Sequence, residues 1–282
     1  YWFVDLYVRG AVGEVLAIAW VMLALCAIER HRRRTAAVAV ALIIVSHNIM
    51  ALVFLPILLI YILIRHRSTL PLLFIGIGLA SYFWVPAILE RSYVVGLNSV
   101  NFQDHFPALV QLLLPSWGTG FSQPGVAADE MSFQIGFVPL LVLAASAIYL
   151  IRKNVLALYF FLLCGTAFLL MQERSIPIWQ NISVLSYVQY PWRLLAVFLP
   201  AVALLSAYLA DRIRYGLFGL LLAAGAVVFG FSYTRPVVYA PRSDEYYLSR
   251  PNFTDGTSSL GNSFSARWSS WKEKRPAQKV DV

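Results

Sequence analysis

The segment from Glu29 to Arg67 constrains the fold of this chain more than any other. It opens with the basic run ERHRRR, continues as a long apolar stretch interrupted by Ser46-His47-Asn48, and closes with RHR. Short loops rich in arginine and lysine stay on the cytoplasmic side of a membrane. We therefore expect both basic clusters inside, and the apolar stretch must go out and return as a hairpin whose apex is Ser-His-Asn.

The outer arm of this hairpin, Thr35–Ser46, is short. At roughly 1.5 Å per residue it reaches only ~18 Å, whereas the hydrocarbon core of a bilayer is ~30 Å thick. We expect the apex below the outer membrane surface, in a recess built by protein, because irregular polar backbone is otherwise excluded at that depth. The alternative is one long tilted helix, kinked at Pro56, with His47 in its core. That helix would put the two basic clusters on opposite sides of the membrane.

The composition also indicates a membrane protein. Of the 282 residues, 60% are hydrophobic and 13% are charged, against about 25% charged in soluble domains. The net charge of +8 does not indicate a nucleic-acid partner, because the basic residues gather in short loops and in the polar tail. Ten of the 22 Lys and Arg residues lie in four loops that we place inside: Arg30, Arg32, Arg33, Arg34, Arg65, Arg67, Arg152, Lys153, Arg212 and Arg214.

The apolar stretches predict an all-α, polytopic membrane bundle of about eight spans with both ends outside. The spans are the two arms of the hairpin and the segments Ala11–Ile28, Leu70–Leu89, Ile135–Ile151, Val155–Met171, Leu194–Ala210 and Leu217–Tyr233. The transmembrane domain is expected over residues 1–234, with outer loops at 90–134 and 172–192. Short surface helices are expected at Phe106–Leu114 and Pro177–Leu185. The tail, 235–282, is expected outside, and the residues beyond about Pro241 are expected to be the least ordered part, because their composition cannot bury enough apolar surface.

Four polar groups collect on the outer side of this topology. In the first, Asp5 and Arg9 are four residues apart and can pair on one helical face. Glu14 lies one turn inside the first span, on the face of Gly10 and Ala17. An intramembrane carboxylate is a functional candidate by default, although Glu14 can also snorkel to the interface. The other groups are Ser46-His47-Asn48, Asp104-His105 and Tyr190-Pro191-Trp192-Arg193.

Arg193 stands at the mouth of a span, behind a proline and beside a tryptophan. A guanidinium there can hold a phosphate through two charge-assisted hydrogen bonds, and His47 can donate to the same anion. The alternatives are an interface anchor for Arg193 and ordinary loop polarity for Asp104-His105. The sequence has no glycine-rich phosphate loop, GxSxG or HExxH motif, and its four histidines divide between the two sides. A histidine zinc site is therefore not expected.

Three stretches resemble a bacterial family, the 6-pyruvoyl-tetrahydropterin synthase-related membrane proteins: DLYVRGAVGE, LIIVSHNIMALVFLPILLIYIL and IPIWQNISVLSYVQYPWRLL. The soluble synthase of that name uses a three-histidine zinc site, which the histidine distribution does not supply. The layout is instead similar to the GT-C glycosyltransferase superfamily, which implies sugar transfer from a polyprenyl-phosphate donor at the outer face of the bacterial cytoplasmic membrane.

On this resemblance Arg193, His47 and Arg9 would hold the lipid phosphate, with Asn48 and Tyr190 beside them. The catalytic carboxylate of such enzymes lies in the first outer loop. Because the chain begins Tyr-Trp-Phe without an initiator methionine, we interpret it as a fragment in which that loop lies upstream. Asp5, Glu14 and Asp104 are the carboxylate candidates within it.

The expected partners are membrane lipid and the polyprenyl-phosphate sugar. No cofactor is predicted, and a requirement for a divalent metal stays open. The rival functions are a lipid or polysaccharide transporter, which would need pseudo-symmetric halves, and a non-catalytic membrane scaffold.

Overall fold

The computed structural model describes residues 1–94, 101–118, 120, 122–125, 130–149, 154–213 and 216–235, together with 243, 245 and 266–268. Within these residues the chain is helical, and its β-structure is limited to one isolated bridge between Val94 and Ala266. Most of the predicted tail, and with it the predicted lack of order, lies outside the described residues.

The chain divides into two compact units, Tyr1–Ala80 with Val100–Val237, and Ser81–Ser99 with Val238–Val282. The second unit contains α5 (Ser81–Leu89), the 3-10 turn η3 (Arg91–Tyr93) and the bridge. There the Arg267 N–H donates to Tyr93 O at 2.9 Å. The helix packing and the site described below belong to the first unit.

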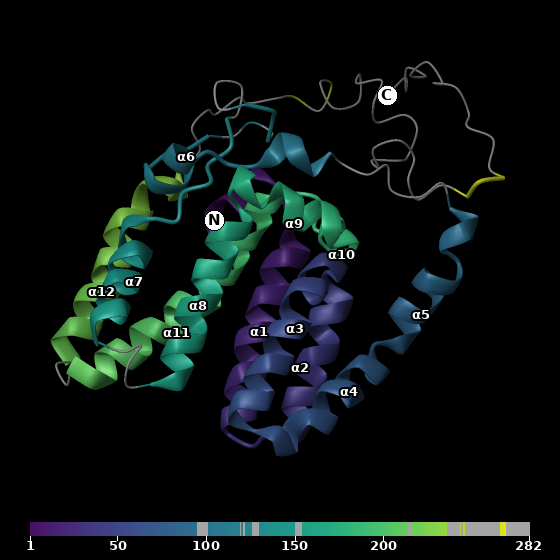
Figure 1. Cartoon of the computed structure of the whole chain (residues 1–282), viewed down its shortest axis with the longest axis horizontal. Coiled ribbons are helices and arrows are strands. Elements are labelled where there is room, and N and C mark those ends of the chain that lie inside the picture. Colours follow the sequence, from purple (N-terminus) through teal and green to yellow (C-terminus); the bar gives the residue numbers. More distant parts are fainter. Residues whose placement is uncertain are drawn as a thin grey trace. The chain divides into compact units, whose positions relative to one another are not determined.

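Four consecutive helices pack together at the N-terminal end of the first unit (Figure 1). They are α1 (Val12–Glu29), α2 (Arg33–Ser46), α3 (Asn48–Arg65) and α4 (Leu70–Leu79), with η2 (Arg67–Thr69) before α4. Glu29 Oε1 lies 3.2 Å from His66 Nε2 and 3.3 Å from Arg65 Nε. At the other end of α1, Glu14 lies beside His47. α1 and α3 are therefore parallel, and α2 runs back between their ends.

This arrangement is the hairpin predicted from the two basic clusters, and the single long helix kinked at Pro56 is wrong. The rings of His31 and His66, one from each cluster, lie 5.1 Å apart at the same end of the bundle. The chain breaks at His47, whose backbone is extended (φ −162°). Its Nδ1 accepts a hydrogen bond from the Met50 N–H at 3.2 Å, so His47 caps the N-terminus of α3.

A second group consists of α7 (Phe137–Tyr149), α8 (Val155–Leu170), α11 (Leu195–Ile213) and α12 (Gly216–Gly230). α11 packs against the other three. Short turns and helices connect these long helices. The two short surface helices predicted from the sequence differ from those observed. The helix expected at Phe106–Leu114 is α6 (Leu109–Leu113), and the single helix expected at Pro177–Leu185 is two, α9 (Ile176–Asn181) and α10 (Ser183–Ser186). The remaining short elements are η1 (Val4–Val8), η4 (Phe102–His105), η5 (Glu173–Ser175), η6 (Pro191–Leu194) and η7 (Phe231–Thr234).

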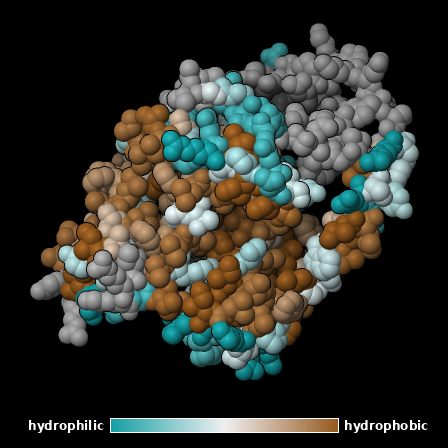
Figure 2. Space-filling model, in the orientation of Figure 1, coloured by the Kyte–Doolittle hydropathy of each residue, from teal (hydrophilic) through white to brown (hydrophobic). Residues whose placement is uncertain are grey.

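Four stretches of the described helices are long and apolar enough to cross a membrane, Val12–Glu29, Asn48–Arg65, Pro191–Ile213 and Gly216–Thr234. Two bent helix pairs raise this number to six if each pair is one span. The two remaining predicted spans, α2 with 14 residues and α7 with 13, are shorter than these four stretches. Figure 2 shows hydrophobic residues over much of the helical surface, as expected for a membrane-embedded protein.

Glycine sets the distance between α2 and α4. A Cβ at Gly76 would lie 2.5 Å from Val40 Cβ and 2.6 Å from Ala37 O, whereas a Cβ at Gly78 meets no atom within 4 Å. Gly76→Ala should therefore destabilise the protein by roughly 1–3 kcal/mol through overpacking. Gly78→Ala, on the same helix, should be neutral or stabilising because alanine is the better helix former. Thermal unfolding in detergent measures both, and equal melting temperatures for the two variants would contradict the close packing.

Candidate functional site

Polar and charged side chains from distant parts of the first unit meet around one buried carboxylate. They come from η1 and the residues flanking it, from the first turn of α1, from the hairpin apex and from η6. We name them the Glu14 cluster: Tyr1, Asp5, Arg9, Glu14, His47 and Arg193. Glu14 has no solvent-exposed surface, so it does not snorkel to an interface.

A tight turn brings Arg9 onto Glu14. Gly10 has φ 64°, in the left-handed region that favours glycine, and the chain folds back there between η1 and α1. Arg9 Nη1 donates to Glu14 Oε2 at 2.6 Å, and its Nη2 donates to Oε1 at 3.1 Å. The same guanidinium also donates to Asp5 Oδ1. Arg9 thus holds Glu14 with the two-pronged geometry that guanidinium offers to carboxylates and phosphates.

Arg193 reaches the same carboxylate from the entrance of α11. Its Nε lies 2.9 Å from Glu14 Oε1, outside hydrogen-bond geometry, so the contact is ionic. Its Nη1 donates to Val188 O at 2.9 Å and to Gln189 Oε1 at 2.8 Å. Gln189 has φ 69°, a strained conformation for a residue other than glycine, and such strain tends to occur at functional sites. Arg193 is therefore held in place by protein and is not an interface anchor.

His47 completes the ring of groups around Glu14. Because its Nδ1 accepts the Met50 N–H, a neutral ring carries its proton on Nε2, and Nε2 lies 3.5 Å from Glu14 Oε1. The apex can approach this closely because residue 13 is glycine: a Cβ there would lie 2.5 Å from Ser46 O. The close approach thus occurs at Gly13, whereas a Cβ at Gly10 would meet no atom within 4 Å.

Aromatic rings cover the cations on one side. The Cζ of Arg9 lies 4.7 Å from the ring centre of Trp192, and the Cζ of Arg193 lies 5.0 Å from that of Tyr190. Both distances are within the range of cation–π attraction. The ring of His105 lies 4.8 Å from that of Tyr190, and partial burial lowers the pKa of His105.

The charges of the cluster nearly balance, with two arginines against two carboxylates. Asp5 is the less satisfied carboxylate, because its Oδ2 is buried without a hydrogen-bond partner. Burial and the neighbouring Glu14 raise the pKa of Asp5. Solvent reaches mainly Arg9 and His47, whose side chains are 13% and 22% exposed. An incoming anion would therefore meet the guanidinium of Arg9 and the Nε2–H of His47 first.

The structure brings together most of the predicted site residues. Asp5, Arg9, Glu14, His47 and Arg193 meet, and Tyr190 borders them. Asn48 does not join: it is exposed, and its Oδ1 accepts from the Ile49 N–H at 2.8 Å. Asp104 is also exposed and bonds to Asn101 instead.

Sequence reasoning missed two members of the site. Tyr1 donates its hydroxyl hydrogen to Glu14 Oε2 at 3.1 Å. Gln189 orients Arg193, and the spacing of four residues between the two was a usable signal. The position of Tyr1 carried no comparable signal, because it depends on the fold of η1.

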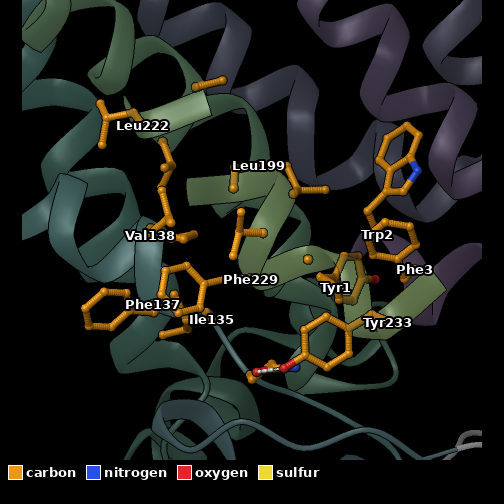
Figure 3. Close-up of a pocket in the computed structure, with 18 of the residues that line it drawn as sticks. Tyr1, Trp2, Phe3, Ile135, Phe137, Val138, Leu199, Leu222, Phe229 and Tyr233 are labelled. Carbon is orange, nitrogen blue, oxygen red and sulfur yellow. Dashed lines mark hydrogen bonds between the residues drawn. The ribbon is translucent and has the colours of Figure 1, made fainter. Parts of the chain in front are cut away.

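An apolar cavity of about 800 Å³ lies beside the cluster, among the N-terminal residues, α7, α11 and α12. We name it the α11–α12 cavity. Figure 3 shows Leu199, Leu222 and Phe229 on one part of its wall, and Tyr1 on another. Tyr1 is the residue shared between the cavity and the Glu14 cluster.

Comparisons of the chain with protein-family models, with curated proteins and with solved structures found no match. Among the residues that the structure describes, no group of three or more His, Cys, Asp or Glu side chains is arranged to hold a metal ion.

The burial of Glu14 leads to a prediction about stability, and Glu29 serves as the control residue. Glu14→Gln leaves buried guanidinium charge uncompensated, which should cost roughly 3–5 kcal/mol of stability. Glu29, at the other end of α1, also pairs with cations, but its side chain is 36% exposed. Glu29→Gln should therefore cost at most about 1 kcal/mol. Thermal unfolding in detergent compares the two, and a loss at Glu14 no larger than that at Glu29 would count against a buried ionic centre.

The two ring nitrogens of His47 can be tested separately. His47→Asn keeps a good N-cap for α3 and loses the contact with Glu14, whereas His47→Ala loses both. His47→Ala should be less stable than His47→Asn by about 1 kcal/mol, the usual worth of an N-cap. Equal unfolding temperatures for the two variants would show that the cap contributes nothing.

Proposed function

We propose that the chain is the membrane part of a GT-C-like glycosyltransferase that takes a sugar from a polyprenyl-phosphate donor at the outer face of a bacterial cytoplasmic membrane. The proposal includes eight spans, an extracytoplasmic tail and kinship with the 6-pyruvoyl-tetrahydropterin synthase-related membrane proteins. The observation that carries it is the convergence of Arg9, His47 and Arg193, from three distant segments, on one point beside an apolar cavity.

The carboxylate of Glu14 marks the position at which an anion fits. A phosphate presents oxygens at spacings similar to those of a carboxylate, and guanidinium holds both in the same two-pronged manner. In the proposal, the lipid phosphate enters past Arg9 and His47 and shares their charge with Glu14. Binding thus divides the guanidinium charge between two anions within a site that the fold has already formed.

The chemistry of transfer accounts for two arginines at this point. An acceptor hydroxyl attacks C1 of the sugar, the bond from C1 to the phosphate oxygen breaks, and the polyprenyl phosphate leaves with the electron pair. Guanidinium groups stabilise the charge that develops on the leaving phosphate. The proton of the acceptor goes to a carboxylate, for which Asp5 and Glu14 are the candidates within the cluster.

A non-catalytic membrane scaffold is the second candidate function, and one observation favours it. Each cation of the cluster already has Glu14 as a partner, as in a cluster whose role is to hold three segments together. The two functions differ in one measurable respect: a scaffold has no affinity for polyprenyl phosphate that depends on these cations.

The test is the binding of a polyprenyl phosphate to the full-length protein in nanodiscs. A charge-assisted contact contributes roughly 1.5–3 kcal/mol, so Arg193→Ala should weaken binding about ten- to a hundredfold. Arg193→Lys should restore it only in part, because lysine lacks the planar fork. Arg67 is an exposed arginine of the RHR cluster, far from Glu14 in the sequence. Arg67→Ala is therefore the matched control and should leave binding unchanged.

Because Arg193 is buried, folding must be separated from binding. Thermal unfolding identifies variants that have lost the fold, and Arg9→Lys, at a more exposed cation, gives a second measurement of the same site. Folded Arg193→Lys and Arg9→Lys proteins that both bind polyprenyl phosphate with unchanged affinity would exclude the proposed site and leave the scaffold.

A further inference from the structure

The α11–α12 cavity is elongated along the helices that form it. On α11 its wall extends from Leu199 to Ala210, and the eleven helical steps between these residues correspond to roughly 16 Å. On α12 it includes Gly219, Ala223 and Ala226. The small side chains of Ala223 and Ala226 leave space that larger ones would fill, whereas a Cβ at Gly219 would lie 3.4 Å from Ala210 Cβ. The cavity therefore has the form of a channel parallel to α11, and its length suits a linear molecule.

The wall of the channel offers hydrocarbon contacts. Of the described residues that line it, none is Asp, Glu, Lys, Arg or His. Its polar side chains largely bond within the protein: Tyr233 donates to Gln134 Oε1 at 3.0 Å, as the dashed line in Figure 3 shows, and Ser206 donates to Val202 O at 2.8 Å. A 150 Å³ apolar cavity holds one benzene, so about 800 Å³ has room for about five such groups.

The channel begins at the charged cluster. Leu199 lies near the start of α11, six residues after Arg193, and Tyr1 lines the channel while its hydroxyl donates to Glu14. At the far end the wall reaches Ala210, next to Asp211 and Arg212 at the opposite end of α11. A molecule with an anionic head and a long apolar chain matches this succession of cations, one tyrosine and a hydrocarbon wall.

We infer that the α11–α12 cavity binds the isoprenoid chain of the lipid phosphate whose head lies at the Glu14 cluster, with Tyr1 at the junction of head and chain. The inference rests on the proposed function for the identity of the head. The chain site itself depends on α7, α11 and α12, which contribute nothing to the cluster.

The test fills the channel with an indole. Ala207→Trp and Ala223→Trp place a large side chain on the lining face of α11 and α12. Ala224→Trp is the matched control, because Ala224 is the neighbour of Ala223 on α12, is exposed and does not line the cavity. The full-length variants in phosphatidylcholine nanodiscs are labelled with a photoreactive decaprenyl phosphate and, separately, with photoreactive decaprenol, and the labelled peptides are identified by mass spectrometry.

We expect Ala207→Trp and Ala223→Trp to reduce labelling by decaprenyl phosphate at least fivefold, and Ala224→Trp to remain within twofold of the unaltered protein. In the unaltered protein the label should lie on lining residues of α11 and α12. Label found only on residues that do not line the cavity, such as Leu221, would overturn the inference even if the tryptophan variants failed to fold. Folded cavity variants that label like Ala224→Trp would overturn it as well, as expected if a protein segment occupies the channel.

The decaprenol arm separates this inference from the proposed function. Decaprenol has the chain without the phosphate, so its labelling should fall in the two cavity variants and stay unchanged in Arg193→Lys. That pattern together with undiminished decaprenyl-phosphate labelling in Arg193→Lys and Arg9→Lys would refute the phosphate site and support the chain site. The converse pattern, with loss in the arginine variants alone, would support the phosphate site and refute the chain site.

Discussion

The compensation of one buried carboxylate is the constraint on which the site depends. An ionised carboxylate taken out of water without partners costs several kcal/mol, and Glu14 is fully buried. Its partners come from three segments: Arg9 from the N-terminal turn, His47 from the hairpin apex and Arg193 from the entrance of α11. Because each segment supplies a polar partner that the others cannot replace, burying Glu14 fixes all three relative to one another.

The sequence meets this requirement with small residues at two points. Gly10 supplies the left-handed turn that folds Arg9 back onto α1, and Gly13 lets the Ser46 carbonyl approach the same helix. The short α2 places the apex beside the first turn of α1. The two ends of α1 then differ in environment, since Glu14 is enclosed while Glu29 remains partly exposed.

The sequence predicted the hairpin well because the positions of arginines in short loops depend on topology alone. It also predicted that Arg9, His47 and Arg193 would gather, but not that Glu14 would be their common partner. Side-chain direction was the limit: His47 faces Glu14, whereas the next residue, Asn48, is exposed and its Oδ1 accepts from the Ile49 N–H. The number of spans stayed uncertain for a similar reason. Hydropathy identifies apolar segments, whereas bends such as the 90° break after α8 depend on local bonds, here from Ser175 and Trp179 to Leu170 O.

The Glu14 cluster as it stands is nearly neutral, and this affects how any anion can bind. A phosphate that enters must share the cations with Glu14, so the net gain is the difference between two similar ionic contacts. The site would then discriminate between a lipid phosphate and a free phosphate by the apolar chain. A chain in the α11–α12 cavity adds about 25 cal/mol of binding free energy per Å² of apolar surface buried, and Glu14 does not compete for this contribution. A preformed charge balance next to an apolar channel thus favours a lipid phosphate over a free phosphate, even though the same cations hold the head of both.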